Sequence, residues 1–319
     1  MSACFTDTCM DIPVQVQVLV LAVTIDLIFG EMPNAAHPVV WIGALIQRTT
    51  TICERASQTS QKQQRYLCGL VLALIVISCA AAAGMLLNVL ASHHQIAGIF
   101  VIAYFLKSTF SIRSLVSSSN LIYRELSAND SVGARSNLTA LVSRDVKGLL
   151  EPQIASAAIE SVSENYVDSI LSPILYFALF GIPGALVYKA INTLDSMVGY
   201  RNERFREIGF VSAKLDDIVN WIPARLSVVF IFVASVPYNP AAALRICLRD
   251  HALPASPNSG YPMAMVAGAL RCRLEKPGSY VLGGEFSDPS GGHIRQANWV
   301  VLVATVILVA VVAVGLAVL

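Results

Sequence analysis

Apolar runs alternate with charged segments along the chain. Four runs carry few or no charged residues, and they occupy residues 14–29, 66–90, 96–112 and 298–319. A helix that crosses a bilayer needs about 20 mostly apolar residues, so each run predicts a membrane-spanning helix. Two weaker runs lie at 170–188, which Gly181 and Pro183 interrupt, and at 222–236, which is short. Each weaker run fits a kinked span, a re-entrant element or a helix buried against protein.

The composition agrees with a chain embedded in lipid. Of the 319 residues, 13% are charged and 55% are hydrophobic, whereas roughly 25% are charged in soluble domains. The net charge of +1 offers no electrostatic attraction for nucleic acid. We therefore predict an all-α polytopic membrane protein with about 4–6 membrane-embedded helices, one integrated domain over residues 1–319, and no nucleic-acid partner.

Loop charges predict sidedness, because cytoplasmic loops collect Lys and Arg. Residues 31–65 and 113–169 are rich in basic residues and the turn at 91–95 has no Lys or Arg, which predicts an outside N-terminus, an inside 31–65 loop, an outside turn and an inside 113–169 region. The segment 189–219 carries five basic residues and leaves two arrangements open. Either both weak runs cross and 189–219 is an exterior loop, or neither crosses fully. We favour the second, because it gathers the polar segments 113–169, 189–225 and 238–295 on one side, in a helical, cytoplasmic region.

Acidic residues concentrate in one part of the chain. Residues 144–217 hold 10 of the 21 acids, several beside apolar runs, where an unpaired acid is costly. A shared polar cavity explains this concentration better than separate solvated faces. Glu160, Glu164 and Asp168 recur every four residues and would form one stripe on a helix. The stripe predicts a Mg²⁺ site, because hard cations prefer carboxylate oxygen, and the alternative is a solvated helix face.

Polar residues on the next segment suit phosphate and metal together. Lys189, Asn192 and Asp195 recur at a spacing of three, which places them near one side of a helix. The alternative is a helix end at which Asn192 or Asp195 acts as a cap. Farther along, Ser256 and Asn258 lie in a proline-rich loop, where they could hold a phosphate or amide group or could serve a rigid structural loop.

Two adjacent aspartates form another motif. Asp216 and Asp217 point in different directions on a helix, so one could bind a metal while the other orients Lys214 or Arg225. The alternative is an acid cluster at a helix N-terminus, which the helix dipole favours.

Asp26 is an acid inside an apolar run. Such a group costs at least a few kcal/mol at membrane depth and normally faces protein or water. Its functional interpretation joins it to Asn34 and His37, and the alternative is an acid near the end of the span that caps the next segment.

Together, and in this order, the motifs resemble the CobD/CbiB family of cobalamin biosynthesis proteins, from about residue 20 to 285. The resemblance rests on Asp26, Gly30, His37-Pro38, Arg144-Asp145, Glu160 to Asp168, Lys189 to Tyr200, Asp216-Asp217 with Arg225, and Ser256 to Gly260. It implies an adenosylcobinamide-phosphate synthase, an acid–amine ligase that joins adenosylcobyric acid to (R)-1-amino-2-propanol phosphate or threonine phosphate. The implied reaction uses ATP and Mg²⁺, and the corrinoid is a substrate.

The motifs and the resemblance together define the expected site. The candidate catalytic residues are Glu160, Glu164, Asp168, Asp216 and Asp217, and the candidate Mg²⁺ ligands are Glu160, Glu164, Asp168 and Asp217. The expected substrate- and phosphate-binding residues are His37, Arg144, Asn165, Lys189, Asn192, Asp195, Lys214, Asn220, Arg225, Ser256 and Asn258. No GxxxxGK[ST] phosphate loop occurs in the sequence, so a nucleotide would need a site of another kind.

The resemblance also implies a setting, a multi-pass protein of the cell membrane. Its expected partners are the two substrates, the lipid bilayer and other membrane enzymes of the cobalamin pathway. Three positions depart from the family pattern: Lys214 replaces a common Arg, Ser169 replaces a common Gly, and Glu275-Lys276 replaces a glycine-rich stretch. Two other functions would also explain the acidic residues. The chain could be a polytopic transporter with a polar path, or a membrane phosphotransferase that acts on a lipid alcohol.

Overall fold

The computed structural model describes residues 12–56, 62–200 and 202–318, and these residues fold almost entirely into helices. The helices are α1 Val14–Phe29, α2 Pro38–Ala56, α3 Lys62–His93, α4 Gln95–Lys107, α5 Ile112–Ser127, α6 Ser131–Leu138, α7 Glu151–Tyr166, α8 Ser172–Val198, α9 Phe210–Val219, α10 Trp221–Ala234, α11 Pro240–Asp250, α12 Gly260–Leu270 and α13 Gly291–Val318. A 3-10 turn, η1 Asn34–Ala36, and a π-helical turn, η2 Val167–Leu171, complete the helical elements. The strands β1 Leu274–Lys276 and β2 Tyr280–Leu282 pair antiparallel as a hairpin.

Four helical stretches are long and apolar enough to cross a membrane: Lys62–His93, Gln95–Ser127, Glu151–Val198 and Gly291–Val318. A fifth is counted if α9 and α10, which meet at a bend of 41°, form one broken span. Helices α1 and α12 are apolar but shorter, so the span predicted at residues 14–29 is not among these stretches. The prediction of an all-α chain with several membrane-length helices is confirmed.

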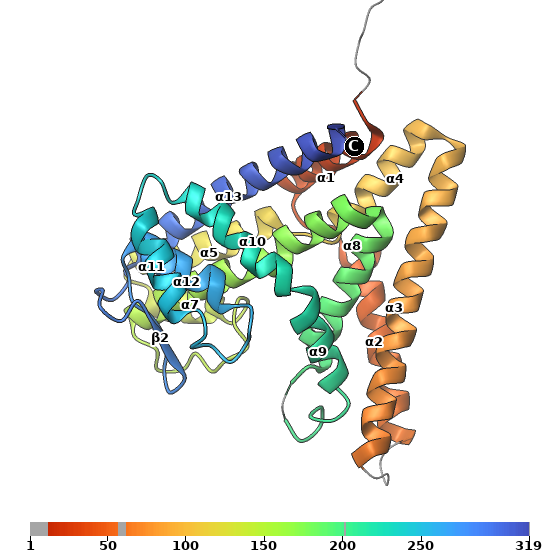
Figure 1. Cartoon of the computed structure of the whole chain (residues 1–319). Coiled ribbons are helices and arrows are strands. Elements are labelled where there is room, and N and C mark those ends of the chain that lie inside the picture. The colour runs from red at the N-terminus through yellow and green to blue at the C-terminus, as the bar shows by residue number, and fades with distance from the viewer. Residues whose placement is uncertain (1–11, 57–61, 201, 319) are drawn as a thin grey trace, which may run out of the picture.

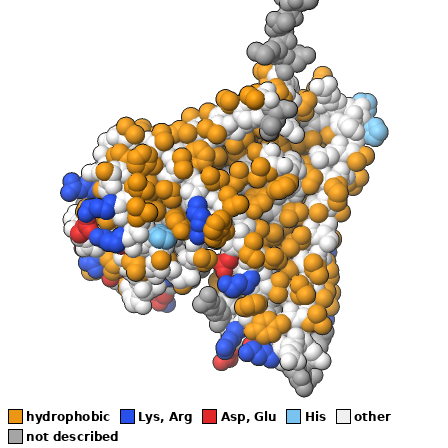
Figure 2. Space-filling model, viewed as in Figure 1, with side chains coloured by type: hydrophobic (Ala, Val, Ile, Leu, Met, Phe, Trp, Pro, Cys, Tyr) orange, Lys and Arg blue, Asp and Glu red, His pale blue; other side chains and the backbone are white. Residues whose placement is uncertain are grey.

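The helices form an elongated assembly (Figure 1). Helix α3 runs along one side with α2 against it, and α4 returns from its far end toward α5. Helices α1 and α13 pack together, α8 packs against α3, and α11, α12 and the hairpin lie at the opposite end of the molecule. Figure 2 shows hydrophobic side chains over a broad face, while charged side chains gather at two ends with a hollow between them. This distribution suits a body whose apolar face meets lipid.

The structure differs from the predicted boundaries in three places. Residues 31–65, expected as a loop, contain α2, whose Ile46 is fully buried. The run 96–112 is broken, because α4 ends at Lys107 and the hydroxyls of Ser108 and Thr109 donate to the carbonyls of Phe105 and Leu106. The weak run 170–188 is longer than predicted, because it continues from α7, most of which is buried, in the stretch Glu151–Val198. The polar sequence of α7 concealed this because Glu160 and Glu164 line cavities.

The predicted interruption at 181–184 is confirmed as a kink in α8. Gly181 has a φ of 65°, a conformation that L side chains rarely adopt, and Pro183 follows inside the helix. Helix α3 approaches this kink closely. A Cβ atom added to Gly84 would lie 2.5 Å from the Cα of Pro183, so a glycine permits the contact.

Contacts at one end of α3 bear on the two open arrangements. Arg204 pairs with Glu54 at 2.6 Å, and Arg65 pairs with Glu207 at 3.4 Å. The segment around residues 203–207 therefore lies against α2 and α3, where the favoured arrangement would put it. The side assigned to the N-terminus concerns residues 1–11, which fall outside the described ranges, as does residue 319 at the end of the last run. The sidedness of the loops stays a prediction.

Candidate active site

A cavity of about 780 Å³ lies where α3, α7, η2, α8, α9 and the loop 255–259 meet. We call it the acidic cavity, because five carboxylates and two basic side chains line it. The carboxylates are Glu164, Asp168, Asp195, Asp216 and Asp217, and the basic residues are Lys214 and Arg206. Carboxylates outnumber bases in this cavity, which favours cations or cationic groups over anions.

Three of these carboxylates are free to bind something else. Within the described ranges, the side chains of Glu164, Asp168 and Asp195 accept no hydrogen bond and form no ion pair. They come from one continuous helical stretch, α7 through η2 to α8, and all three line the cavity. Carboxylates that lack protein donors but face an open cavity are suited to a metal ion, an ammonium group or a proton.

The carboxylate of Asp216, unlike those three, accepts hydrogen bonds from other side chains. Its two oxygens accept hydrogen bonds from Asn192 at 3.4 Å and from Asn220 at 3.0 Å. The amide oxygen of the buried Asn220 accepts from Ser172 at 2.8 Å and from Tyr188 at 2.9 Å. This network joins α8 to α9 and to the start of α10, so Asp216 has a fixed position in the cavity wall.

Asp217 and the loop 255–259 form another part of the wall. Asp217 pairs with Lys214 at 2.8 Å, and its backbone carbonyl accepts a hydrogen bond from the amide of Asn258 at 2.8 Å. The Ser256 hydroxyl accepts from the backbone N–H groups of Asn258 and Ser259. The side-chain oxygen of Asn258 is buried without a partner among the residues described, which leaves it an unmet acceptor beside the cavity.

Lys189 is a partly buried cation on α8. It lies in the electrostatic field of Asp168, Glu31 and Asp216, yet it makes no hydrogen bond or ion pair with any residue that the structure describes. An ammonium group on a flexible stem in this position can reach an anion such as phosphate.

A second cavity, of about 130 Å³, shares Glu164 with the acidic cavity, and we call it the small cavity. Glu160 accepts hydrogen bonds from Ser156 and Tyr280, each at 2.7 Å, and lies 3.6 Å from Arg144. Burial, followed by the charge of Glu160, raises the pKa of the Tyr280 phenol, so it donates as a neutral group. Glu164 lines both cavities, which makes it the carboxylate between them.

A π-helical turn explains how the predicted acidic stripe is divided. Glu160 and Glu164 lie in α7, whereas Asp168 lies in η2, where the helix is wider than an α-helix. Glu160 therefore lines the small cavity, Asp168 lines the acidic cavity and Glu164 lines both. Such π turns are frequent at functional sites.

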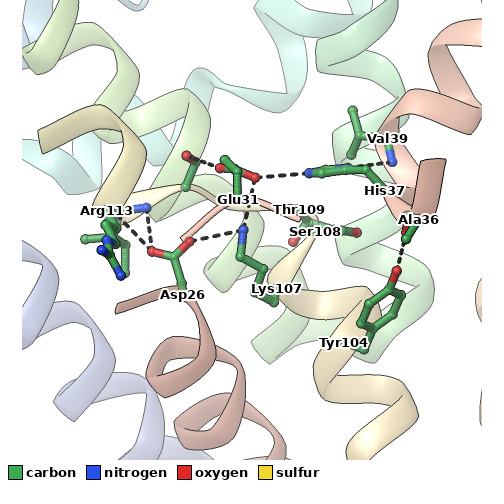
Figure 3. Close-up of polar contacts among 12 residues, drawn as sticks. Asp26, Glu31, Ala36, His37, Val39, Tyr104, Lys107, Ser108, Thr109 and Arg113 are labelled. Atoms are coloured by element: carbon green, nitrogen blue, oxygen red, sulfur yellow. Dashed lines mark hydrogen bonds and ion pairs between the residues drawn. The ribbon is translucent and has the colours of Figure 1, made fainter. Parts of the chain in front are cut away.

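Asp26 belongs to a separate buried cluster (Figure 3). One of its oxygens accepts from the backbone N–H groups of Ile112 and Arg113, at 3.0 and 2.9 Å. It thereby caps α5, whose first amides have no partner within their own helix. Its other oxygen lies 3.3 Å from the ammonium of Lys107, and both side chains are completely buried. Asp26 thus caps a helix, as the alternative interpretation expected, but the capped helix is α5 and not the next segment of the chain.

Glu31 and His37 extend this cluster. Glu31 accepts from Lys107 at 3.0 Å and from Ser111 at 2.5 Å. The Nδ1 atom of His37 accepts from the backbone of Val39, so its Nε2 donates to Glu31 at 3.1 Å. Burial would raise the pKa of Glu31, but hydrogen bonds from His37 and Ser111 and the charge of Lys107 lower it to about 2.

The structure brings most of the expected residues into two neighbouring cavities. Those in the acidic cavity are Glu164, Asp168, Asp195, Lys214, Asp216, Asp217, Asn220, Ser256 and Asn258, and those in the small cavity are Arg144, Glu160, Glu164 and Asn165. Four expected residues line neither cavity. The side chain of Lys189 has no hydrogen-bond or ion-pair partner among the described residues, and Asn192 donates to Asp216. His37 contacts Glu31, and Arg225 stacks on Trp221 and Tyr261 at 4.0 and 4.6 Å.

Sequence reasoning missed several residues that line these cavities. Arg206 and Tyr66 reach the acidic cavity, and Lys276 and Tyr280 reach the small one from the hairpin. The departure from the family pattern at Glu275-Lys276 was a signal for the hairpin. Nothing in the local pattern singled out Tyr280 or Tyr66.

The cavities offer ligands for a metal without a complete cage. Within the described residues, no three His, Cys, Asp or Glu side chains are grouped closely enough to hold an ion by themselves. Mg²⁺ usually takes one or two carboxylates and completes its shell with water and substrate phosphate. The free carboxylates of Glu164, Asp168 and Asp195 fit that mode, and they overlap the predicted ligands in Glu164 and Asp168.

Comparison with known proteins shows which family the chain resembles. The chain matches the family described as CobD/Cbib protein over residues 19–301. It is 42% identical over 299 residues to a probable cobalamin biosynthesis protein CobD of Methanothrix thermoacetophila, covering 88% of this chain and 90% of the relative. It is 40% identical over 269 residues to the cobalamin biosynthesis protein CobD of Dehalococcoides mccartyi, covering 83% and 86%.

A third relative extends the match to almost the full length. A probable cobalamin biosynthesis protein CobD of Pyrococcus furiosus is 36% identical over 304 residues, covering 93% of this chain and 98% of the relative. No solved structure matches the chain. The family match includes the acidic region 144–217 and both cavities, and the chain belongs to the CobD/CbiB family.

Proposed function

We propose that this chain is an adenosylcobinamide-phosphate synthase of cobalamin biosynthesis, acting in the cell membrane. It would join the free carboxylate of adenosylcobyric acid to the amine of (R)-1-amino-2-propanol phosphate, or of threonine phosphate. The observation that carries the proposal is the pair of adjoining polar cavities on either side of Glu164, in a chain of this family. A condensation of two substrates needs two binding regions that meet at one reacting point.

The acidic cavity suits the activation half of such a reaction. A carboxylate must be activated before an amine displaces its oxygen, and transfer of the γ-phosphoryl group of ATP would form an acyl phosphate and ADP. Asp168 and Asp195 would hold Mg²⁺, which when bound neutralises phosphate charge and orients the transfer. Asp217 is a further candidate ligand, although Lys214 already neutralises part of its charge.

Other residues of the chain would bind and orient the substrates. Lys189 and Lys214 would attract phosphate, and Asn258, with its unpaired buried oxygen, would accept a hydrogen bond from an amide group. The corrinoid is rich in amide side chains, so acceptors of this kind favour it. The network of Asn192, Asn220 and Asp216 would keep the cavity wall rigid, which preserves the alignment of reacting groups.

The test is an assay of the purified protein in detergent with both substrates, ATP and Mg²⁺, followed by mass spectrometry of the corrinoid. We expect a product that has gained the mass of the amine less one water, and no product when ATP is omitted. Glu164→Gln should abolish turnover without changing yield or elution volume. As a matched control, Glu285→Gln should keep full activity, because Glu285 lies outside both cavities and pairs with Arg245 on the surface.

Product analysis also separates the rival functions. A translocated but unchanged solute would favour a transporter, and a new phosphodiester would favour a membrane phosphotransferase. An unchanged corrinoid with every amine tested, in folded protein, would contradict the proposed synthase.

A further inference from the structure

The small cavity has a size that limits what it can hold. Its volume is about 130 Å³, against about 780 Å³ for the acidic cavity. Sites for drug-sized ligands typically span roughly 300–1,000 Å³, so neither a corrin ring nor a nucleotide fits inside it. A compact molecule with a few heavy atoms does fit.

The walls of the small cavity carry charges of both signs. Arg144 and Lys276 provide the positive charges, and Glu160 and Glu164 provide the negative ones. Tyr280 and Ser156 donate to Glu160, and Arg144 lies near it, so its charge is already compensated. Glu164 accepts no hydrogen bond and forms no ion pair with any residue described, so it is the one carboxylate of this cavity without a partner.

Arg144 also has unused donors. Its Nε and Nη1 atoms are buried and have no hydrogen-bond partner within the described ranges, although its Nη2 lies 3.6 Å from Glu160. A buried guanidinium with two unmet donors is costly unless an acceptor is supplied. The planar fork of Arg matches a phosphate in two parallel hydrogen bonds. Lys276 is exposed and has no ion pair among the residues described, so it adds a free positive charge.

We propose that the small cavity is the subsite for the amino-alcohol phosphate, with its phosphate on Arg144 and Lys276 and its amine directed at Glu164. This inference rests on the proposed synthase function and adds the location of the small substrate. An amino-alcohol phosphate carries an ammonium and a phosphate a few bonds apart, and the cavity presents one free carboxylate and two basic groups to match. Glu160 already has Tyr280 as a hydrogen-bond donor and Arg144 as a nearby positive charge. Glu164 is therefore the carboxylate that remains available to the amine.

Glu164 then has a defined chemical task, because it also lines the acidic cavity. The amine lies beside Glu164 as an ammonium group and loses one proton to solvent before it attacks. The free amine nitrogen forms a bond to the acyl carbon while the bond from that carbon to the phosphate oxygen breaks. Phosphate leaves with the electron pair of that bond, and the second amine proton is lost to solvent. The amide joins the two substrates across the wall that Glu164 forms.

The experiment measures preference between two amines in the detergent assay, with ATP, Mg²⁺ and adenosylcobyric acid. The kcat/KM for (R)-1-amino-2-propanol phosphate is divided by that for the same amine without phosphate. Arg144→Gln should lower this ratio about 10- to 100-fold, the loss expected for a charge-assisted contact, and should leave the KM for adenosylcobyric acid within about 2-fold. Lys276→Met, on the exposed hairpin, should lower the ratio in the same direction and is not expected to disturb folding.

Two comparisons complete the test. Lys214→Met, in the acidic cavity, should alter the kinetics of ATP or corrinoid and leave the amine ratio unchanged. Arg245→Gln, a surface variant outside both cavities, should change neither. An unchanged ratio in Lys276→Met and in folded Arg144→Gln would overturn the subsite while amide synthesis by the wild type stands. If the wild type makes no amide, the proposed function itself fails.

Discussion

The buried pair of Asp26 and Lys107 allows a quantitative test of the fold. Lys107 lies 3.3 Å from Asp26 and 3.0 Å from Glu31, and the side chains of Lys107 and Asp26 are fully buried. Lys107→Met removes the only positive charge that the structure shows within 4 Å of Asp26 among the described residues. Breaking a buried ion pair by removing one partner costs about 3–5 kcal/mol, because an uncompensated charge remains. Glu31 adds little to this cost, since it is part-exposed and keeps His37 and Ser111.

A double-mutant cycle separates the pair from its surroundings. Asp26→Asn retains an oxygen that accepts from the backbone of residues 112 and 113, so its cost should be below that of Lys107→Met. The double variant has no buried charge left at this site, and we expect its loss of stability to be at least about 1 kcal/mol smaller than the sum of the two single losses. Unfolding in mixed detergent micelles, followed by tryptophan fluorescence, measures all four free energies.

The surface pair of Arg204 and Glu54 provides the matched control. Arg204→Gln disrupts an ion pair whose Arg is 65% exposed, so the stability should hardly change. A Lys107→Met variant within about 1 kcal/mol of the wild type, or strictly additive single variants, would refute the view that Asp26 and Lys107 stabilise each other.

Two further predictions concern packing and pH. Gly84→Ala should destabilise the protein by about 1–3 kcal/mol, because the new Cβ would meet the backbone of Pro183 at 2.5 Å; Gly315→Ala, with nothing within 4 Å, should be neutral or slightly stabilising in thermal unfolding. The pKa of Glu31 falls from 4.5 to about 2 on folding, so its contribution is complete above pH 4.5 and is lost as the pH falls toward 2. Glu31→Gln should therefore flatten the pH dependence of stability in that window, and an identical dependence in both proteins would count against the pKa shift.

The sequence allowed much of the site to be predicted, because its residues cluster in two stretches. Glu164, Asp168 and Asp195 attract notice as acids beside apolar runs, and all three line one cavity. Asp216 and Asp217 also lie there, and they point to different neighbours as adjacent helical residues should. Charged residues beside apolar runs therefore point to a functional site, because bulk water does not solvate them there.

Other features depend on tertiary contacts that local spacing does not encode. Spacing assumes a regular α-helix, so it could not show that a π turn separates Asp168 from the small cavity. Arg225 looked like a ligand because of its charge, but its guanidinium stacks on two aromatic rings, a role that charge alone does not reveal. Lys276 and Tyr280 reach the cavity only because the hairpin folds back over α7.

The π turn at Val167–Leu171 has a consequence for how this chain can diverge. Each residue of an α-helix advances the chain by about 100° around the axis, so deleting one residue from the turn would rotate α8 relative to α7 by about that angle. Asp195 would leave its place in the acidic cavity, while every side chain remained chemically intact. Except at Asp168, substitution in this turn should therefore be tolerated far better than any change in its length, and homologous chains should keep the same number of residues between Glu164 and Asp195.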